Sequence, residues 1–290
     1  MKQIVSASRR TDIPAWYGEW FRRRLDEGVA RYRTAFSPRE HEVSLRPEDV
    51  LAFVFWTRLP RAFSPVLDRL DQRGFAYYFQ YTVTGYPAFL ERKVPSARSE
   101  EGLLRLAARL GPARVVWRYD PILFTAGLER PDHVRSFSRL ASRFSGAVDT
   151  VMVSFLDRYR KVERRLRKEG ISVRDPEGPE GHDLLAELHE IARRNGIRLV
   201  TCCEEAWRPR HVARGACIDA ERLRSLLPAG GAEGIRPGPT RKECLCARSR
   251  DIGAYDTCLF DCVYCYAVHG RKAAIERRKA HRPEAVNLCE

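Results

Sequence analysis

Short runs of apolar, β-branched and aromatic residues recur along the first part of the chain. They predict strands at residues 3–8, 51–57, 75–83, 114–121, 150–157 and 197–204. Most of these runs are hydrophobic at nearly every position rather than at alternate positions. That pattern is typical of strands that are buried on both faces of a parallel sheet.

Segments with a helical spacing of apolar residues separate these strands. Helices are predicted at residues 14–28, 61–74, 100–111, 131–144 and 182–196, and several of them end in glycine, a usual helix stop. The alternation of strand and helix predicts an α/β fold. Because the unit recurs about six times, we expect a (β/α) barrel or partial barrel.

The pattern changes after residue 205. Residues 206–257 show little strand periodicity, and the stretch 226–243 is rich in glycine and proline. A region with so few apolar runs would form a poor core alone. We therefore expect a barrel over residues 1–205 and a C-terminal, cysteine-rich cluster-binding region over residues 206–290 that packs on the barrel mouth.

Polar residues collect where the predicted strands end, which in a (β/α) barrel is the rim that binds ligands. The candidate substrate-binding residues at this rim are Arg9, Arg10, Asp12, Arg118, Asp120 and Glu204. Each also has a structural interpretation. Asp12 can cap the following helix, and Arg118 with Asp120 can form a buried ion pair.

The charge balance points to acidic partners without identifying one. The net charge is +14, and 45 of the 52 basic residues are arginine. Because arginine matches phosphates and carboxylates, a substrate with acidic or phosphate groups is predicted. Nucleic-acid binding is a weaker expectation, since the basic segments 21–24, 158–168 and 271–282 are well separated and resemble solvated helix faces.

The distribution of cysteine indicates a metal site. No apolar run reaches the roughly 18 residues that cross a bilayer, and the first residues lack a signal-peptide pattern, so we expect a cytoplasmic protein without a membrane partner. In that compartment disulfides are rare. None of the nine cysteines precedes residue 202, and five lie between residues 244 and 265. Such clustering favours metal binding.

Three of these cysteines, Cys258, Cys262 and Cys265, have the spacing C-x3-C-x2-C. A structural zinc site needs four ligands. A four-iron four-sulfur cluster can instead be held at three corners by one loop, which leaves one iron without a protein thiolate. Two alternatives remain: a buried helical face, or a zinc site completed by His269 or by the C-x-C pair at 244–246.

A second metal site is predicted from other cysteines. The four thiolates of Cys202, Cys217, Cys244 and Cys246 could hold a second cluster or a zinc ion, with Cys202 preferred over its neighbour Cys203. The alternative is that these residues are small buried side chains.

The motif at 258–265 also has an aromatic residue before its last cysteine, Tyr264. In this form it resembles the cluster signature of radical SAM enzymes. The resemblance implies a four-iron four-sulfur cluster whose open iron binds S-adenosylmethionine, with Tyr264 against the adenine. It further implies one-electron cleavage to a 5′-deoxyadenosyl radical, and a small electron donor such as flavodoxin or ferredoxin.

Most of the chain resembles a narrower group, the bacterial and archaeal family called domain of unknown function 1848. The stretches that carry this resemblance are SASRRTDIPAWY at 6–17, RYDPI at 118–122 and CLCARSRDIGAYDTC at 244–258, followed by CVYCYA. In radical SAM enzymes the cysteines usually follow the first strand, whereas here they follow six predicted strands. Either the fold is circularly permuted, with the motif loop and a helix at 270–280 preceding strand 3–8, or a C-terminal lid covers an intact barrel.

The sequence thus predicts a radical SAM-like enzyme with an unidentified substrate. Two other classes stay open. One is an iron–sulfur protein that acts without S-adenosylmethionine, by electron transfer or by direct activation of substrate at the open iron. The other is a zinc-bearing module that binds nucleic acid.

Overall fold

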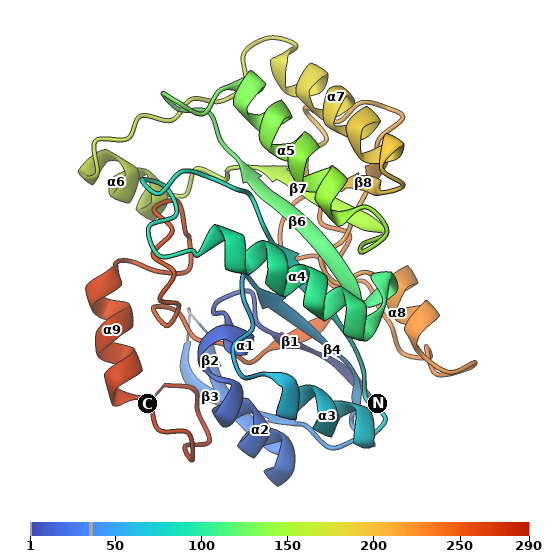
Figure 1. The fold of residues 1–290 in the computed structure, drawn as a ribbon. Coiled ribbons are helices and arrows are strands. Elements are labelled where there is room, and N and C mark those ends of the chain that lie inside the picture. The colour runs from blue at the N-terminus through green and yellow to red at the C-terminus, as the bar shows by residue number, and fades with distance from the viewer. Residues whose placement is uncertain (1, 35–36, 290) are drawn as a thin grey trace.

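The computed structural model describes residues 2–34 and 37–289. Its centre is an eight-stranded parallel sheet with the strand order β10–β1–β4–β5–β6–β7–β8–β9 (Figure 1). The strands are β1 (Gln3–Ala7), β4 (Val50–Thr57), β5 (Ala76–Thr82), β6 (Val115–Ile122), β7 (Thr150–Phe155), β8 (Arg198–Thr201), β9 (Ala213–Arg214) and β10 (Ser249–Asp251). All six predicted strands are present, and the predicted α/β class with a parallel sheet is confirmed.

The central strands are hydrophobic on both faces because the sheet is covered on both sides. Along β4, Phe53 and Phe55 belong to one buried cluster, while Ala52 and Val54 belong to another. Successive side chains of a strand point to opposite faces, so these two clusters mark the two faces of the sheet. The larger cluster lies under the helices, and we call the opposite side the inner face.

Helices that alternate with the strands cover the first face, as Figure 1 shows for α2, α3, α4, α5 and α7. Their bounds are α1 (Ile13–Trp16), α2 (Gly18–Glu27), α3 (Ser64–Gln72), α4 (Ser96–Leu110), α5 (Arg130–Phe144), α6 (Arg160–Lys168) and α7 (Glu180–Arg194). Short turns such as η1 (Pro112–Arg114) connect helices to strands. The helices predicted from periodicity are therefore present, with the first one divided at Tyr17.

The inner face is covered by the segment between β9 and β10. Ala216, Ile218 and Leu223 pack in the inner-face cluster, the last of them from α8 (Ala220–Leu226). Arg222 attaches this helix to the start of β7 through a 2.7 Å contact with Asp149. The predicted division at residue 205 stays a prediction, but β9 and β10 both belong to the main sheet.

The three-residue strand β10 pairs in parallel with β1 near the start of the chain. The register places Ile4 opposite Ser249 and Ser6 opposite Asp251. Since the two strands run in the same direction, the loop after β10 leaves from the edge of the sheet that carries the carboxyl ends of the other strands. The pairing thus places β10, near the C-terminal end of the chain, beside β1, near its start.

An antiparallel hairpin, β2 (Val29–Thr34) with β3 (Ser37–Ser44), and helix α9 (Arg271–Ala280) complete the fold. In Figure 1 the hairpin and α9 lie near each other, and Asn287 in the following tail forms a bridge with Arg31 of the hairpin. Across the described residues, no helix combines the length and the apolar character needed to cross a membrane.

Candidate metal centre

The loop that follows β10 carries Cys258, Cys262 and Cys265 at the carboxyl edge of the sheet. Ligands of parallel α/β sheets bind at this edge. The segment after β5 holds the loop in place: Val263 N–H donates to Leu90 O at 2.9 Å, and Lys93 N–H donates to Phe260 O at 3.1 Å. The loop thus has a defined backbone conformation before any ligand is considered.

The three thiols lie in largely buried surroundings. Cys262 is buried and the other two are half-buried. Burial raises the pKa of Cys258 well above its usual value and that of Cys262 to about 12, although the charge of Arg58 opposes the shift at Cys262. Ala267 N–H donates to Cys265 Sγ at 3.4 Å. Backbone N–H groups aimed at sulfur are a common feature of thiolate-ligated clusters.

A buried charged network lies directly behind the cysteine loop. Arg58 donates to Glu91 Oε1 at 2.7 Å and to the hydroxyl of Tyr264 at 2.6 Å. Tyr264 also donates to Glu91, and Thr84 donates to the same carboxylate at 2.7 Å. Glu91 is only 3% exposed. A buried ion pair is stable only when its other donors and acceptors are also hydrogen-bonded. Tyr264 of the cysteine loop supplies part of this bonding, so the network holds the loop in position.

Tyr264, predicted to lie against a nucleotide base, is 5% exposed and packs edge-on against Tyr86. Its hydroxyl is occupied by the network just described. The structure therefore gives this residue a clear structural role, and its contact with a cofactor stays a prediction.

Two further contacts hold the ends and the tip of the loop. Asp261, at the tip, forms a buried ion pair with Arg165 of α6. Asp256 accepts a 2.8 Å hydrogen bond from His269 beyond the motif. Both aspartates have positive φ angles, 60° for Asp256 and 54° for Asp261. The chain therefore turns sharply shortly before Cys258 and directly before Cys262.

The residues after β1 contact the end of β10 through Asp251. This carboxylate accepts hydrogen bonds from Ser6 at 2.6 Å, from Arg9 N–H at 2.8 Å and from Arg10 Nε at 3.0 Å. Burial alone would raise the pKa of Asp251, but the charge of Arg10 and the hydrogen bonds lower it overall. Arg10 is thus engaged in joining the two strands, and its predicted contact with a substrate stays a prediction.

Asp12 caps α1. Its Oδ1 accepts from Ala15 N–H at 2.9 Å and its Oδ2 accepts from Arg58 N–H at 2.7 Å. Burial raises the pKa of Asp12 to about 7, although both of these backbone hydrogen bonds lower it. Since each oxygen is taken by a backbone amide, the capping interpretation accounts for this residue.

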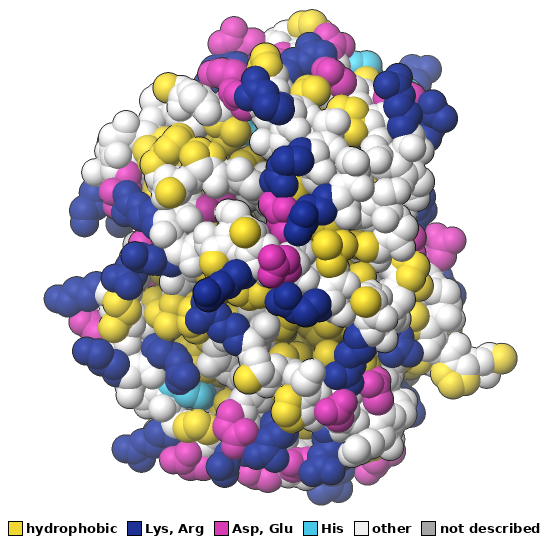
Figure 2. Space-filling model, in the orientation of Figure 1, with side chains coloured by type: hydrophobic (Ala, Val, Ile, Leu, Met, Phe, Trp, Pro, Cys, Tyr) yellow, Lys and Arg dark blue, Asp and Glu magenta, His cyan; other side chains and the backbone are white. Residues whose placement is uncertain are grey.

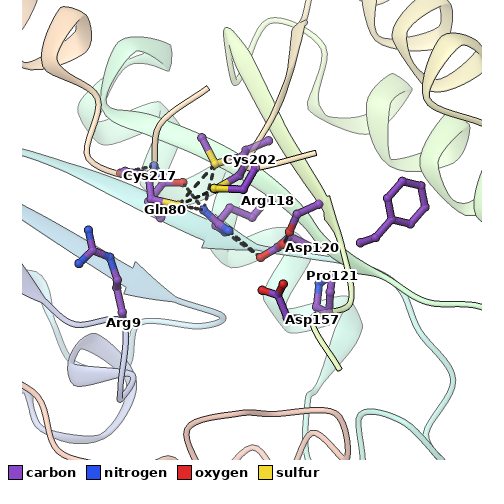
Figure 3. Close-up of polar contacts among 12 residues, drawn as sticks. Arg9, Gln80, Arg118, Asp120, Pro121, Asp157, Cys202 and Cys217 are labelled. Atoms are coloured by element: carbon purple, nitrogen blue, oxygen red, sulfur yellow. Dashed lines mark hydrogen bonds and ion pairs between the residues drawn. The ribbon is translucent and has the colours of Figure 1, made fainter. Parts of the chain in front are cut away.

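On the inner face the predicted pair Arg118 and Asp120 is present, with Nη2 2.6 Å from Oδ2. Figure 3 shows Arg118 between this carboxylate, Gln80 and Cys217, and Ser154 also donates to Asp120. Glu204 lies past the end of β8, where its Oε1 accepts from Phe155 N–H at 3.0 Å.

Cysteines from three separate segments meet beside Arg118. The sulfur of Cys202 lies 3.5 Å from that of Cys217 and 4.0 Å from that of Cys203. Cys246 lies within hydrogen-bonding reach of Cys217 and of Cys244. The hydrogen bonds from Cys202 and Cys246 lower the pKa of Cys217 well below its usual value. Within the described residues, neither cysteine group nor any other set of three His, Cys, Asp or Glu side chains surrounds one point closely enough to hold a single metal ion.

Comparison with known proteins identifies the family. The family described as "Domain of unknown function (DUF1848)" matches this chain over residues 4–267, which is nearly its whole length. The chain belongs to the DUF1848 family. No curated protein matches it. Among solved structures, the DUF1848 chain is similar to the D-hydantoinase from a Bacillus sp. AR9, with 11% identity and a TM-score of 0.30 over 70% of this chain. It spans 45% of that chain.

The basic side chains of the DUF1848 protein are spread over its surface. Figure 2 shows Lys and Arg interspersed with Asp and Glu across one face. A cleft of about 270 Å³ beside the hairpin is lined by Arg10, Arg31, Arg33 and Arg277 among others. Three of these arginines form ion pairs with acidic residues. Binding of nucleic acid or of an acidic substrate stays a prediction.

Sequence reasoning did not find every residue that shapes the site of the DUF1848 protein. Glu91 is a single acidic residue in the stretch FLERK, and nothing in the local pattern shows that it is buried. Arg241, which forms an ion pair with Asp157 and lies 3.3 Å from Cys202 O, stands in the glycine-rich stretch interpreted as a loop. Both were brought to the site by long-range packing.

Proposed function

We propose that this protein is a radical SAM-like iron–sulfur enzyme in which Cys258, Cys262 and Cys265 hold a four-iron four-sulfur cluster. The donor set suits such a cluster: three thiols lie on one loop that backbone hydrogen bonds hold, and one of them, Cys265, accepts from a backbone N–H. The three thiols lie within eight residues of one another in a loop with tight turns. Three ligands leave one iron for a small molecule.

The observation that carries the proposal is the parallel pairing of β10 with β1. It makes β10, the cysteine loop and α9 one β-loop-α unit at the edge of the sheet, next to β1 in the strand order. In radical SAM enzymes the cysteine loop follows the first strand of the barrel. The same spatial order arises here if the chain is circularly permuted, so this arrangement supports a permuted partial barrel over a separate lid.

When bound, the cluster would supply one electron to S-adenosylmethionine, whose cleavage gives a 5′-deoxyadenosyl radical able to remove hydrogen from a substrate. The chain's own residues would prepare the site. Arg58 and Glu91 hold Tyr264 and the second half of the motif in position. Arg165 holds Asp261 at the tip of the loop. Burial raises the pKa of Cys262, and the positive charge of Arg58 beside it offsets part of that shift.

Substrate recognition is proposed at the inner face, at the same edge of the sheet. Arg118, Asp120 and Gln80 there form a connected polar group under the carboxyl ends of the central strands. A small reductase of the flavodoxin or ferredoxin type would supply the electron, by resemblance to radical SAM enzymes.

The test uses anaerobically reconstituted protein. Iron and sulfide are quantified, and the EPR spectrum of the dithionite-reduced protein is recorded with and without S-adenosylmethionine. A spectrum that changes with S-adenosylmethionine, together with release of 5′-deoxyadenosine, is the expected result. Replacing Cys258, Cys262 and Cys265 together by alanine should abolish both signals, whereas Cys289→Ala, outside the motif, should leave them.

Other results would separate the alternatives. An unchanged spectrum and no cleavage would overturn the use of S-adenosylmethionine and leave an iron–sulfur protein that acts by electron transfer or binds substrate directly. Zinc without iron at these cysteines would overturn the cluster itself.

A further inference from the structure

The cysteines outside the motif form a second group with its own position in the fold. Cys202 follows β8, Cys217 follows β9, and Cys244 with Cys246 precede β10. Three chain segments that are far apart in sequence therefore bring their sulfurs together. Chance burial of cysteine as a small apolar residue does not require such convergence.

The sulfur–sulfur distance between Cys202 and Cys217 suits ligation of one zinc ion. Four thiolates around one zinc ion lie about 3.8 Å apart, since the Zn–S distance is about 2.3 Å in a tetrahedral site. The separation of Cys202 from Cys217, 3.5 Å, is close to that value. The half-buried Cys244 completes the group from a loop, and ligation would draw it toward the others.

The surrounding charges match a negative centre. Arg118 Nη1 donates to Cys217 Sγ at 3.1 Å, and Arg241 Nη2 lies 3.9 Å from Cys202 Sγ. Arg9 extends toward the same group (Figure 3), and its buried Nη2 has no hydrogen-bond partner among the described residues. A buried donor on a cation without a partner is costly. Arg118 and Arg241 also pair with Asp120 and Asp157, so Arg9 is the guanidinium that a negatively charged thiolate–metal centre would balance.

This group is separate from the motif cysteines. Cys202 and Cys246 pack in the inner-face cluster, whereas Cys262 packs in the cluster under the helices. Arg9 lies between the two groups: its carbonyl accepts a 2.6 Å hydrogen bond from Tyr266, the residue after Cys265, and its side chain lies over the ring of Trp56 on the inner face.

We infer that Cys202, Cys217, Cys244 and Cys246 form a second, four-thiolate site for a thiophilic metal centre, either an iron–sulfur cluster or a zinc ion. All four positions are filled by protein, so this centre is closed, unlike the three-cysteine site. A closed centre joins β8, β9 and the strand that precedes the motif loop, and it fixes the segment that covers the inner face.

The test starts from the full chain with Cys258, Cys262 and Cys265 all replaced by alanine. This variant, purified anaerobically, should still contain about four irons with sulfide, or about one zinc, per chain. Iron with sulfide identifies a cluster and zinc a single ion. Adding Cys202→Ala and Cys217→Ala should remove that metal, whereas adding Cys289→Ala should not. The test does not depend on the proposed radical chemistry, because it measures metal and not cleavage of S-adenosylmethionine.

A second measurement needs no substitution. The unmodified protein is alkylated with iodoacetamide under native conditions, with and without prior removal of metal by a chelator, and the labelled cysteines are identified by mass spectrometry. We expect the four residues to be protected until metal is removed, while Cys289 reacts equally in both samples. Metal-free protein in the first test, or a Cys202–Cys217 disulfide, or labelling of all four cysteines that the chelator does not change, would overturn the inference.

Discussion

The carboxylate of Asp251 lies 3.0 Å from Nε of Arg10, which joins the end of β10 to the segment that follows β1. The two residues are more than two hundred positions apart in the chain, and their side chains are only 16% and 11% exposed. Asp251 also accepts from Ser6 and from two backbone amides. One carboxylate therefore sets the position of the strand from which the cysteine loop starts.

Replacing Asp251 by alanine should lower the free energy of unfolding by about 3 kcal/mol, because it leaves the buried guanidinium of Arg10 without its partner. Urea unfolding measures the change. The matched control is Arg105→Ala, which breaks a 3.4 Å pair with Glu101 on an exposed helix face and should cost about 0.5 kcal/mol or less. Equal losses in the two variants would show that the Asp251 contact does not hold β10.

Gly253 lies where the loop passes Ser8. A side chain at this position would bring a Cβ atom to 2.6 Å from Ser8 Cβ, so Gly253→Ala should destabilise the protein by about 2 kcal/mol and lower the amount of iron bound on reconstitution. Gly270 is the control, since an added Cβ there meets nothing within 4 Å. If both variants bind iron like the unmodified protein, the close approach at Ser8 has no bearing on the loop.

Glu91→Gln keeps the shape of the buried network but removes the charge that balances Arg58. The loss should be about 3 kcal/mol in urea unfolding, with weaker iron binding at the motif cysteines. Tyr264→Phe removes one hydroxyl and leaves the ion pair, and it should cost about 1 kcal/mol. A larger effect from Tyr264→Phe than from Glu91→Gln would contradict the view that the ion pair supports the loop.

His133, which belongs to neither cysteine group, predicts a pH dependence of stability. It is fully buried, with Nε2 2.9 Å from Leu123 O and Nδ1 3.1 Å from the hydroxyl of Tyr119, and burial lowers its pKa to about 4. The unfolded chain therefore binds this proton between about pH 6.5 and pH 4 while the folded chain does not. The stability due to neutral His133 is complete above pH 6.5 and is lost as the pH falls through this window, by about 3 kcal/mol in total.

Urea unfolding at several pH values tests this. Carboxylates also titrate in the same range, so the comparison is between the slopes of stability against pH for the unmodified protein and for His133→Gln. The variant should lose the part of the slope between pH 6.5 and pH 4 that belongs to His133. Identical slopes would show that His133 does not stay neutral in the folded protein.

The central strands could be predicted because burial on both faces leaves a continuous apolar run in each of them. The edge strands could not. β9 has two residues, and β10 is Ser-Arg-Asp, which is polar and is defined by its pairing with β1 rather than by its own composition. The hairpin at 29–44 was also missed, since its alternating charged residues, such as Arg31 and Glu42, pair across exposed strands.

For the candidate site, too, the sequence pointed to some features and could not show others. Cysteine spacing and clustering pointed to the residues of both groups, because few other roles place so many thiols close together in sequence. Spacing could not show that Cys202 meets Cys217, since that contact depends on how β8 and β9 lie in the sheet. The buried charged residues near the cysteines, such as Glu91, could not be predicted either, because their burial also depends on contacts between distant parts of the chain.

The pairing of β10 with β1 also orders events during protein synthesis. A chain emerging from the ribosome presents β1 early, but one edge of that strand lacks its neighbour until residues 249–251 have been made. The motif cysteines emerge later still, on the loop that this pairing positions. The proposed cluster could therefore enter the motif site only after nearly all of the described fold has been translated, and an interrupted chain would be left with an open sheet edge that can pair with another chain.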